Sequence, residues 1–326
     1  MIDLFGLLKS TGAFKTVRGD KQSGRLSHAY LILTPDGENL TEYLKIFARL
    51  LACEQVEPCF NCRTCKLIGE NSFTDVILCP KDGAAISSEQ VTELIGESYV
   101  KPLEGDKKIF IITNAQNMNA SAQNKLLKTL EEPPRGVHII MGATSAYPLL
   151  STIKSRVKKL EIPSFSSDKL FNALKGEYPD EKRLLAAIAC GDGTVGQAQL
   201  NYADESLKEL TSLCQEVIVD MSSSSEVLKY SIKIAASKCD INKFLSVLEL
   251  LYRDLLVYTE GKKDFISNST FERLKEAKGY KTGSIINALE KINQAAERKK
   301  FNANATMLIE WLLFQILEGK YKWQKS

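Results

Sequence analysis

Five short runs of apolar and β-branched residues in the first half of the chain place the strongest constraint on its fold. They cover residues 30–33, 76–78, 109–112, 138–141 and 157–160, and most of them are continuous rather than alternating with polar residues. Continuous runs of this length are typical of strands that are buried on both faces of a parallel sheet. Stretches with helical periodicity separate the runs. The pattern therefore predicts a doubly wound α/β domain over residues 1–163.

Helical periodicity continues after the last of these runs, and no further strand is expected. Residues 164–205 are predicted to form a small helical domain, and residues 206–326 a second helical domain. Apolar stripes over residues 241–258, 285–296 and 307–317 indicate its main helices. We therefore expect an α/β domain followed by all-α domains.

The segment that links the first strand to the next helix, residues 34–41, lies where nucleotide-binding units place a phosphate-binding loop. Gly37 and Thr41 suit such a loop, but Leu40 occupies the position at which a lysine would contact the β- and γ-phosphates. An apolar side chain cannot neutralise phosphate charge, so we expect a nucleotide-binding architecture that has lost its nucleotide. A Pro-Asp-Gly turn after a strand is the alternative that this segment leaves open.

Four of the eight cysteines, Cys53, Cys59, Cys62 and Cys65, lie within thirteen residues. Two-residue spacers bend the chain sharply enough for a tetrahedral thiolate site, so the cluster predicts structural zinc. Arg63 and Lys66 are expected to offset the negative charge of four thiolates. An iron–sulfur cluster is the competing interpretation, because C-x2-C-x2-C also begins a ferredoxin motif, but residues 70–74 lack the next cysteine. A chain without any metal is the third alternative.

Size and composition exclude several classes of protein. With 326 residues, the chain is expected to form two or three domains. Its net charge of +3 is too small to indicate nucleic acid or a membrane surface as a partner. No apolar run reaches transmembrane length, and the first residues lack a cleavage site for export. We therefore expect a cytoplasmic protein with no membrane partner.

The helix expected over residues 119–132 ends in a specific motif. Residues 122–134 read AQNKLLKTLEEPP, which closely resembles the signature of bacterial sliding-clamp loaders, AAA+ proteins related to replication factor C. The resemblance extends to residues 26–30, the four cysteines, Ser155-Arg156, residues 191–196 and residues 301–304, in the order of the family. It implies an AAA+ α/β domain with an inserted zinc module, a small helical lid domain and a helical C-terminal collar domain.

Departures from the family pattern indicate a subunit without ATPase activity. Where the family has an acidic pair that holds magnesium and positions water, this chain has Thr113 and Asn114. Where the family has an arginine that senses the γ-phosphate, Gly196 stands. Together with Leu40, three charged contacts to a nucleotide are missing, so we expect neither bound ATP nor catalysis by this chain alone.

Arg156, preceded by Ser155, matches the family arginine that enters the ATP site of a neighbouring subunit. The planar guanidinium suits phosphate oxygens, and such arginine fingers accelerate hydrolysis by roughly 10³ to 10⁵. A solvated Ser-Arg pair beside several lysines is the alternative that the residues alone would favour. The resemblance makes Arg156 a finger that acts in trans, with Ser155 as its support.

The resemblance also implies partners. They are ATPase subunits of the gamma/tau type and a delta-type subunit in a hetero-pentamer, part of the DNA polymerase III holoenzyme. Through this assembly the chain would contact a sliding clamp and primer-template DNA. Two rival interpretations remain: an ATP-hydrolysing motor subunit of the same loader, and a redox or binding protein centred on the cysteines.

Overall fold

The computed structural model describes residues 2–80, 86–237, 240–261, 271–300 and 304–322. The chain forms two compact units. The first runs to Lys169 and also contains Thr194–Gly196, and the second contains Leu170–Gly193 and the residues from Gln197 onward. The expected division into three domains stays a prediction.

A five-stranded parallel sheet forms the centre of the first unit. Its strands lie in the order β2-β3-β4-β1-β5, and each neighbouring pair is parallel. The parallel sheet predicted from the five apolar runs is therefore confirmed. The strands are β1 (Ala29–Leu33), β2 (Val76–Cys79), β3 (Lys108–Ile112), β4 (Val137–Ala143) and β5 (Lys158–Glu161).

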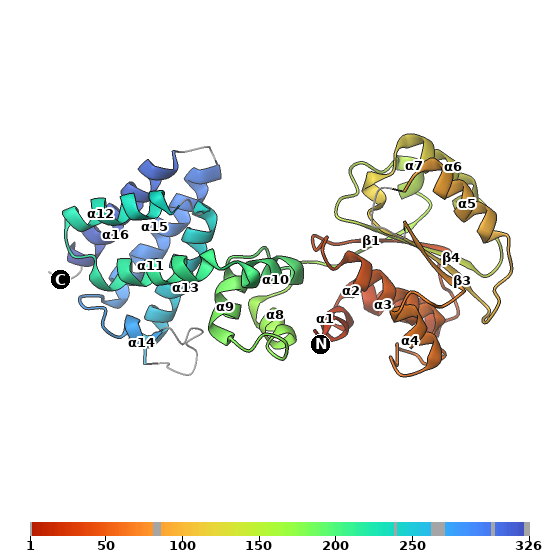
Figure 1. The fold of residues 1–326 in the computed structure, drawn as a ribbon, viewed down its shortest axis with the longest axis horizontal. Helices are drawn as coiled ribbons and strands as arrows, with labels where there is room; N and C mark the ends of the chain where they lie inside the picture. The colour runs from red at the N-terminus through yellow and green to blue at the C-terminus, as the bar shows by residue number, and fades with distance from the viewer. Residues whose placement is uncertain (1, 81–85, 238–239, 262–270, 301–303, 323–326) are drawn as a thin grey trace. The chain divides into compact units, whose positions relative to one another are not determined.

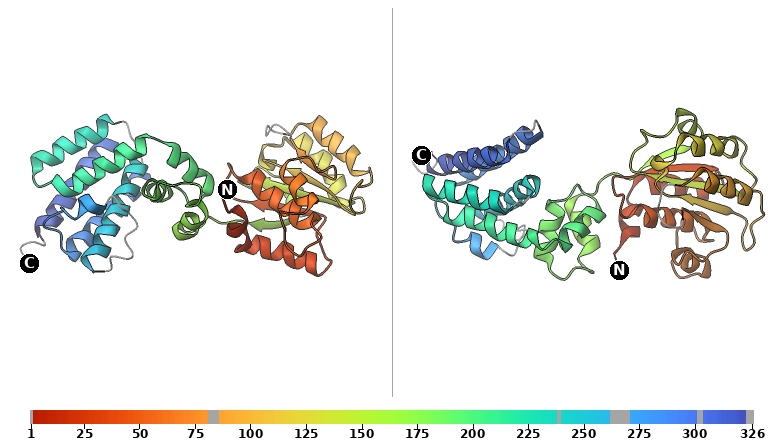
Figure 2. Two further views of the ribbon diagram at one scale, coloured as in Figure 1. Left: turned by 60° about the horizontal axis from the view of Figure 1, so that its bottom comes forward. Right: turned by 45° about the horizontal axis from the view of Figure 1, so that its top comes forward.

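Helices cover both faces of this sheet, which explains why the central strands are apolar at successive positions. Side chains of a strand alternate between the two faces. Leu31 packs into the cluster beneath the helices after β2, while Tyr30 and Ile32 are equally buried on the opposite face. One face carries α5 (Ser88–Ser98), α6 (Ala120–Glu131) and α7 (Ser151–Lys154), and the other side carries α1 (Leu4–Lys9), α2 (Gly12–Gln22), α3 (Leu40–Ala52) and α4 (Arg63–Gly69) (Figure 1, Figure 2).

Local signals set the ends of these helices. Ser87 and Gln90 form a capping box at the start of α5, with side-chain and backbone groups bonded in both directions. The Asn119 side chain accepts a hydrogen bond from the Ala122 N–H and so caps α6, the helix of the AQNKLLKTLEEPP motif. A short 3₁₀ turn, η1 (Ala115–Asn117), precedes α6. These caps fix where α5 and α6 begin, and the opposite end of α6, at Glu131, contributes to one of the sites below.

In the described part of the second unit, every element of secondary structure is a helix. The expected helices over residues 241–258, 285–296 and 307–317 correspond to α13 (Ile241–Thr259), α15 (Thr282–Lys300) and α16 (Ala305–Lys322). These helices share one apolar core with α9 (Glu181–Ala189), α11 (Ser206–Asp220) and α12 (Ser224–Ala236). Residues 262–270 of the expected connection lie outside the described residues. The other helices that follow β5 are α8 (Ser167–Leu174), α10 (Val195–Ala203) and α14 (Phe271–Leu274).

Among the described residues, none of the helices combines the length and the apolar character needed to cross a lipid bilayer.

Candidate functional site

Leu40, at the position where a phosphate-binding loop has its lysine, is part of the core. It is the first residue of α3 and is 1% exposed. A Cβ atom built on Gly142 of β4 would lie only 2.8 Å from Leu40 Cδ1, so the leucine packs directly on the backbone of the strand. Thr41 is half-buried in the same first turn of α3. The side chain that follows the loop therefore points into the protein and stabilises it.

Asp36, in the loop after β1, occupies the place where such loops hold an anion. Asp36 is 2% exposed, and its carboxylate accepts hydrogen bonds from the Tyr43 hydroxyl at 2.8 Å and the Asn39 N–H at 3.2 Å. Two more donors come from Thr194–Gly196, which belongs to the same unit: Val195 N–H at 3.1 Å and Gly196 N–H at 3.3 Å. Backbone N–H groups that could face a phosphate thus face an internal carboxylate.

The surroundings of Asp36 leave little room for a charged side chain from a neighbouring residue. Burial, and then the nearby Asp36 carboxylate, raises the pKa of Tyr43 well above its ordinary value, so the phenol stays protonated and donates. A Cβ atom on Gly196 would lie 2.6 Å from Asp36 Oδ1 and 2.5 Å from Glu38 Cβ. An arginine at position 196 would therefore require this network to rearrange.

Thr113 and Asn114, at the end of β3, provide neutral groups at the positions that correspond to the acidic pair. Thr113 is buried, and its hydroxyl oxygen has no hydrogen-bond partner within the described part of the chain. Asn114 has a left-handed backbone with φ of 50°, and its side-chain oxygen accepts from Gln116 Nε2 at 3.3 Å. Neither residue carries a carboxylate, so the usual ligands for magnesium are missing at these two positions.

Gly37 completes this edge of the sheet. Its N–H donates to the Pro35 carbonyl at 3.1 Å, and a Cβ atom on Gly37 would lie 3.3 Å from Thr144 Cγ2. The loop is therefore a tight turn against the end of β4, in agreement with the Pro-Asp-Gly turn. Sequence reasoning missed the part played by Asp36, although an acid in a loop expected to hold an anion was a visible signal.

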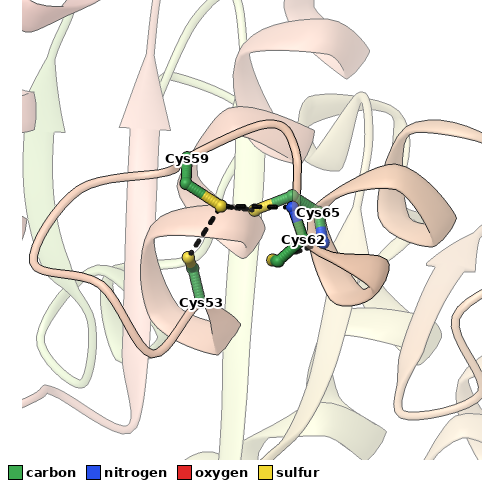
Figure 3. Close-up of side chains that lie close together, drawn as sticks. All are labelled: Cys53, Cys59, Cys62 and Cys65. Atoms are coloured by element: carbon green, nitrogen blue, oxygen red, sulfur yellow. Dashed lines mark hydrogen bonds between the residues drawn. The ribbon is translucent and has the colours of Figure 1, made fainter.

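The four clustered cysteines meet between α3 and α4 (Figure 3). Their sulfur atoms all lie within 4.8 Å of one another, and Cys59 Sγ is 3.8 Å from Cys53 Sγ and 4.0 Å from Cys65 Sγ. Sulfur atoms in a tetrahedron with Zn–S bonds of about 2.3 Å are separated by about 3.8 Å. The structure thus brings together all four sulfur atoms expected to bind zinc, at a spacing that fits the ion.

Backbone donors prepare this cluster for a cation. Cys62 N–H donates to Cys59 Sγ at 3.3 Å, and Cys65 N–H donates to Cys62 Sγ at 3.4 Å. The first of these bonds, with a second from Asn61, lowers the pKa of the Cys59 thiol to about 6. Burial instead raises the pKa of the Cys65 thiol to about 12. A metal that binds both displaces both protons, because thiolates are the ligands.

Positive side chains other than the two expected from the sequence also contact the cluster. Of the expected pair, Arg63 forms an ion pair with Glu104 and lines one hollow with Cys53, Cys59 and Cys62. Lys21 Nζ donates to the Cys53 carbonyl, and Arg49 Nε donates to the Cys65 carbonyl at 2.9 Å. Arg49 also lies over the Phe60 ring. Cations from α2 and α3 therefore bind backbone carbonyls of two of the four cysteines.

Arg156 lies at the opposite edge of the sheet, between α7 and β5. Its Nη1 donates to the Thr152 carbonyl at 3.0 Å and to Ser155 Oγ at 3.2 Å. Its Nη2 lies 2.6 Å from Glu131 Oε1 at the end of α6, and the arginine side chain is 33% exposed. Ser155 therefore contacts Arg156 directly, and its supporting role stays a prediction.

Strand register explains which residue lies beside Arg156. In the parallel pair of β1 and β5, Tyr30 is opposite Lys158, and His28 and Arg156 each lie two residues before that pair, ahead of the strands. His28 and Arg156 line one open hollow with Leu130, Glu131 and Ser155. Within the described residues, His28 Nε2 is buried and has no hydrogen-bond partner. A partly exposed hollow that contains the Arg156–Glu131 ion pair thus forms at the amino end of the strands.

The two charged sites are separated by the length of a strand. Asp36 follows the carboxyl end of β1, and Arg156 precedes the amino end of β5, its parallel neighbour. A strand of five residues such as β1 spans roughly 16 Å. Arg156 therefore cannot contact a ligand in the loop of its own chain.

Comparison with known proteins gives consistent results. A family model described as DNA polymerase III, delta subunit, matches residues 10–166. The chain is 29% identical over 310 residues to DNA polymerase III subunit delta' of Bacillus subtilis, which covers 91% of this chain and 93% of that relative. It is also 29% identical over 219 residues to subunit tau of the same organism, but this covers 66% of the chain and only 37% of tau. A solved gamma subunit-related protein of Thermotoga maritima aligns over 94% of this chain and 99% of its own length, with 17% identity and a TM-score of 0.42.

Proposed function

Because the chain belongs to the family of DNA polymerase III clamp-loader subunits, we propose that it is the delta-prime-type subunit of a bacterial loader. In this role it does not hydrolyse ATP but provides an arginine finger to a neighbouring ATPase subunit. The similarity to a delta' protein over nearly the full length of both chains supports this choice over the motor subunits.

One observation carries the proposal: the two edges of the same sheet hold charges of opposite sign and opposite accessibility. The loop that would hold a triphosphate contains a buried carboxylate, Asp36, and lacks a lysine. Like charges repel, so Asp36 disfavours a phosphate at that place. Arg156 is partly exposed at the other edge, with its Nε–H directed to no acceptor in the described part of the chain.

In the proposed mechanism, Arg156 contacts the γ-phosphate of ATP bound to the adjacent subunit. The guanidinium offsets the negative charge that develops on the transferred phosphoryl oxygens. Ser155 Oγ and the Thr152 carbonyl fix one side of the guanidinium, which limits its rotation. The chain thereby contributes to hydrolysis without binding ATP, and the assembly can close and open around a sliding clamp on primed DNA.

The cysteine module contributes stability to this subunit. Its four sulfur atoms would hold zinc, and four protein ligands leave no open position for a substrate. Elemental analysis of the colourless protein should give one zinc per chain. A brown sample with visible absorbance would instead support an iron–sulfur cluster.

The proposed partners are gamma/tau-type ATPase subunits and a delta-type subunit, with the clamp and primer-template DNA reached through the assembly. The proposed site of assembly is the collar domain expected over residues 206–326. The expected cytoplasmic location stays a prediction.

The decisive experiment replaces Arg156 by alanine in a reconstituted loader and measures single-turnover ATP hydrolysis at the neighbouring subunit. We expect the rate at that site to fall by roughly 10³-fold, with assembly unchanged. Lys154→Ala, which removes a cation two residues before Arg156, is the matched control and should hydrolyse normally. Normal hydrolysis with the Arg156 variant would rule out the finger.

A second experiment separates this proposal from a motor subunit. The isolated chain is titrated with a fluorescent ATP analogue in the presence of magnesium. We expect no saturable binding, because Leu40, Thr113 and Asn114 supply none of the positive or metal-binding groups required, and the Asp36 carboxylate is already bonded inside the protein. Tight magnesium-dependent binding would favour the motor subunit.

A further inference from the structure

We propose that Glu131 is a positioning residue for the Arg156 guanidinium, which it holds ready for the phosphate of a neighbouring nucleotide. This inference rests on the proposed arginine finger and assigns its support. Glu131 Oε1 lies 2.6 Å from Arg156 Nη2. Glu131 itself is not expected to contact the nucleotide.

Glu131 is suited to this role because its backbone is rigidly placed. It is the last residue of α6, whose Ala122, Leu126 and Leu130 are buried in the core of the first unit. A side chain on such a helix is fixed more closely than one on a loop. The guanidinium is thus held between α6 and α7, which provides the Thr152 carbonyl and, from its C-cap, Ser155 Oγ.

The three contacts leave the arginine ordered but available. Thr152 and Ser155 both engage Nη1, whereas Glu131 engages Nη2, so the orientation of the fork requires the carboxylate. An arginine that is already oriented loses less side-chain freedom when it binds phosphate. Because acceptors on both α6 and α7 bind the guanidinium, it is oriented before the neighbouring ATPase subunit binds.

The pair is also weak enough to be exchanged. Arg156 and Glu131 are 33% and 48% exposed, and ion pairs with such exposure contribute little to stability. A phosphate carries more charge than a carboxylate and accepts the same forked donors. Glu131 can therefore orient Arg156 and still release one side of the guanidinium to the nucleotide.

The test uses the reconstituted loader with Glu131→Gln in this chain. The amide keeps the size of the side chain but loses its charge, so Arg156 becomes less ordered. We expect single-turnover hydrolysis at the neighbouring site to slow about three- to tenfold, with the KM for ATP within about twofold of the wild type. Glu131→Asp, which keeps the charge on a shorter side chain, should restore part of the rate.

Glu132→Gln is the matched control. Glu132 carries the same charge one residue later, is exposed, and forms no ion pair within the described residues. This variant should hydrolyse ATP at the wild-type rate. Equal slowing by the two glutamine variants would show a general effect of surface charge and would overturn the role of Glu131.

The Arg156→Ala background separates this inference from the proposed function. If Glu131 acts through Arg156, then Glu131→Gln should cause no further loss in the double variant. A normal rate for Arg156→Ala alone would reject the finger itself. A slow Arg156→Ala variant with a normal Glu131→Gln variant would reject only the positioning role.

Nuclear magnetic resonance of the isolated full chain gives a readout without ATP hydrolysis. With ¹⁵N-labelled arginine, the Nε–H signal of Arg156 is identified by its loss in Arg156→Ala. We expect Glu131→Gln to move and narrow this signal toward that of a free arginine, while Glu132→Gln leaves it in place. An unchanged signal in Glu131→Gln would also overturn the proposal.

Discussion

The loop after β1 and the segment before β5 lie at opposite ends of one parallel sheet, and they use their charged residues differently. Asp36 in the loop is 2% exposed, and four of its donors are groups of its own unit: Tyr43, Asn39, Val195 and Gly196. Arg156 at the other end is 33% exposed and forms one exposed ion pair. The first charge is satisfied inside the protein, whereas the second remains available to a partner.

This difference predicts two kinds of mutational effect. Buried polar networks become costly when one member is lost, because the remaining donors have no replacement partner. Exposed ion pairs contribute roughly 0–1 kcal/mol, since water replaces either partner. Changes at the carboxyl edge of the sheet, where the strands end and Asp36 lies, should therefore reduce the stability of this chain. Changes at the amino edge, where the strands begin and Arg156 lies, should reduce the ATP hydrolysis of the neighbouring subunit.

The largest effect on stability is expected when the missing lysine is introduced at position 40. Leu40→Lys removes a buried leucine from Gly142 and places an ammonium group in the core. We expect the free energy of unfolding of the first unit to fall by about 4 kcal/mol, without any gain of Mg-ATP binding. Hydrogen exchange of the sheet amides measures this free energy directly.

Leu103→Lys is the control for this variant, because Leu103 is 75% exposed in the same unit. It should change the free energy of unfolding by less than about 0.5 kcal/mol. A stable Leu40→Lys variant that binds Mg-ATP would show that the carboxyl edge is an open nucleotide site. The contrast between the two edges would then be lost.

Local patterns in the sequence predicted the five strands and the main helices of the second unit. Both depend on residues close to one another in the chain. Such features are set by hydrophobic period and by local hydrogen bonds. The four cysteines met for the same reason, since they lie within thirteen residues.

Contacts between distant residues could not be predicted in this way. The donors that Asp36 receives from Val195 and Gly196 are 159 and 160 residues away, so nothing in the loop itself revealed them. A second such contact comes from Lys21, which donates to the Cys53 carbonyl from 32 residues away. Tertiary packing decides such pairs, and a single sequence contains no local signal for them.

A smaller loss is expected when the Asp36 carboxylate becomes an amide. Asp36→Asn keeps the shape of the side chain but replaces one acceptor oxygen by a donor that faces other donors. The free energy of unfolding should fall by about 3 kcal/mol, measured by hydrogen exchange of the sheet amides. Asp106→Asn, at a side chain that is 83% exposed, should have little effect. Equal effects of the two variants would mean that Asp36 is not an internal anion.

Metal removal should have the next largest effect, and it tests the end of α3 that lies away from Leu40. Zinc present at about 100 times its dissociation constant should stabilise the first unit by about 2.7 kcal/mol over the metal-free protein. Cys62→Ser should abolish this gain while keeping an oxygen that caps α4. Thermal unfolding with and without a chelator measures the difference. A gain that persists in Cys62→Ser would place the metal elsewhere.

The smallest effect on stability is expected at the amino edge, and it completes the comparison. Arg156→Ala removes one exposed ion pair and two hydrogen bonds to Thr152 and Ser155, groups that water can reach. The free energy of unfolding should change by less than about 0.5 kcal/mol in hydrogen exchange, although the neighbour loses most of its hydrolysis. A loss of more than about 1.5 kcal/mol would show that Arg156 supports its own fold, as Asp36 does. In that case slower hydrolysis by the variant loader would reflect a damaged subunit, because an arginine needed to hold α6 and α7 together is not free to contact phosphate.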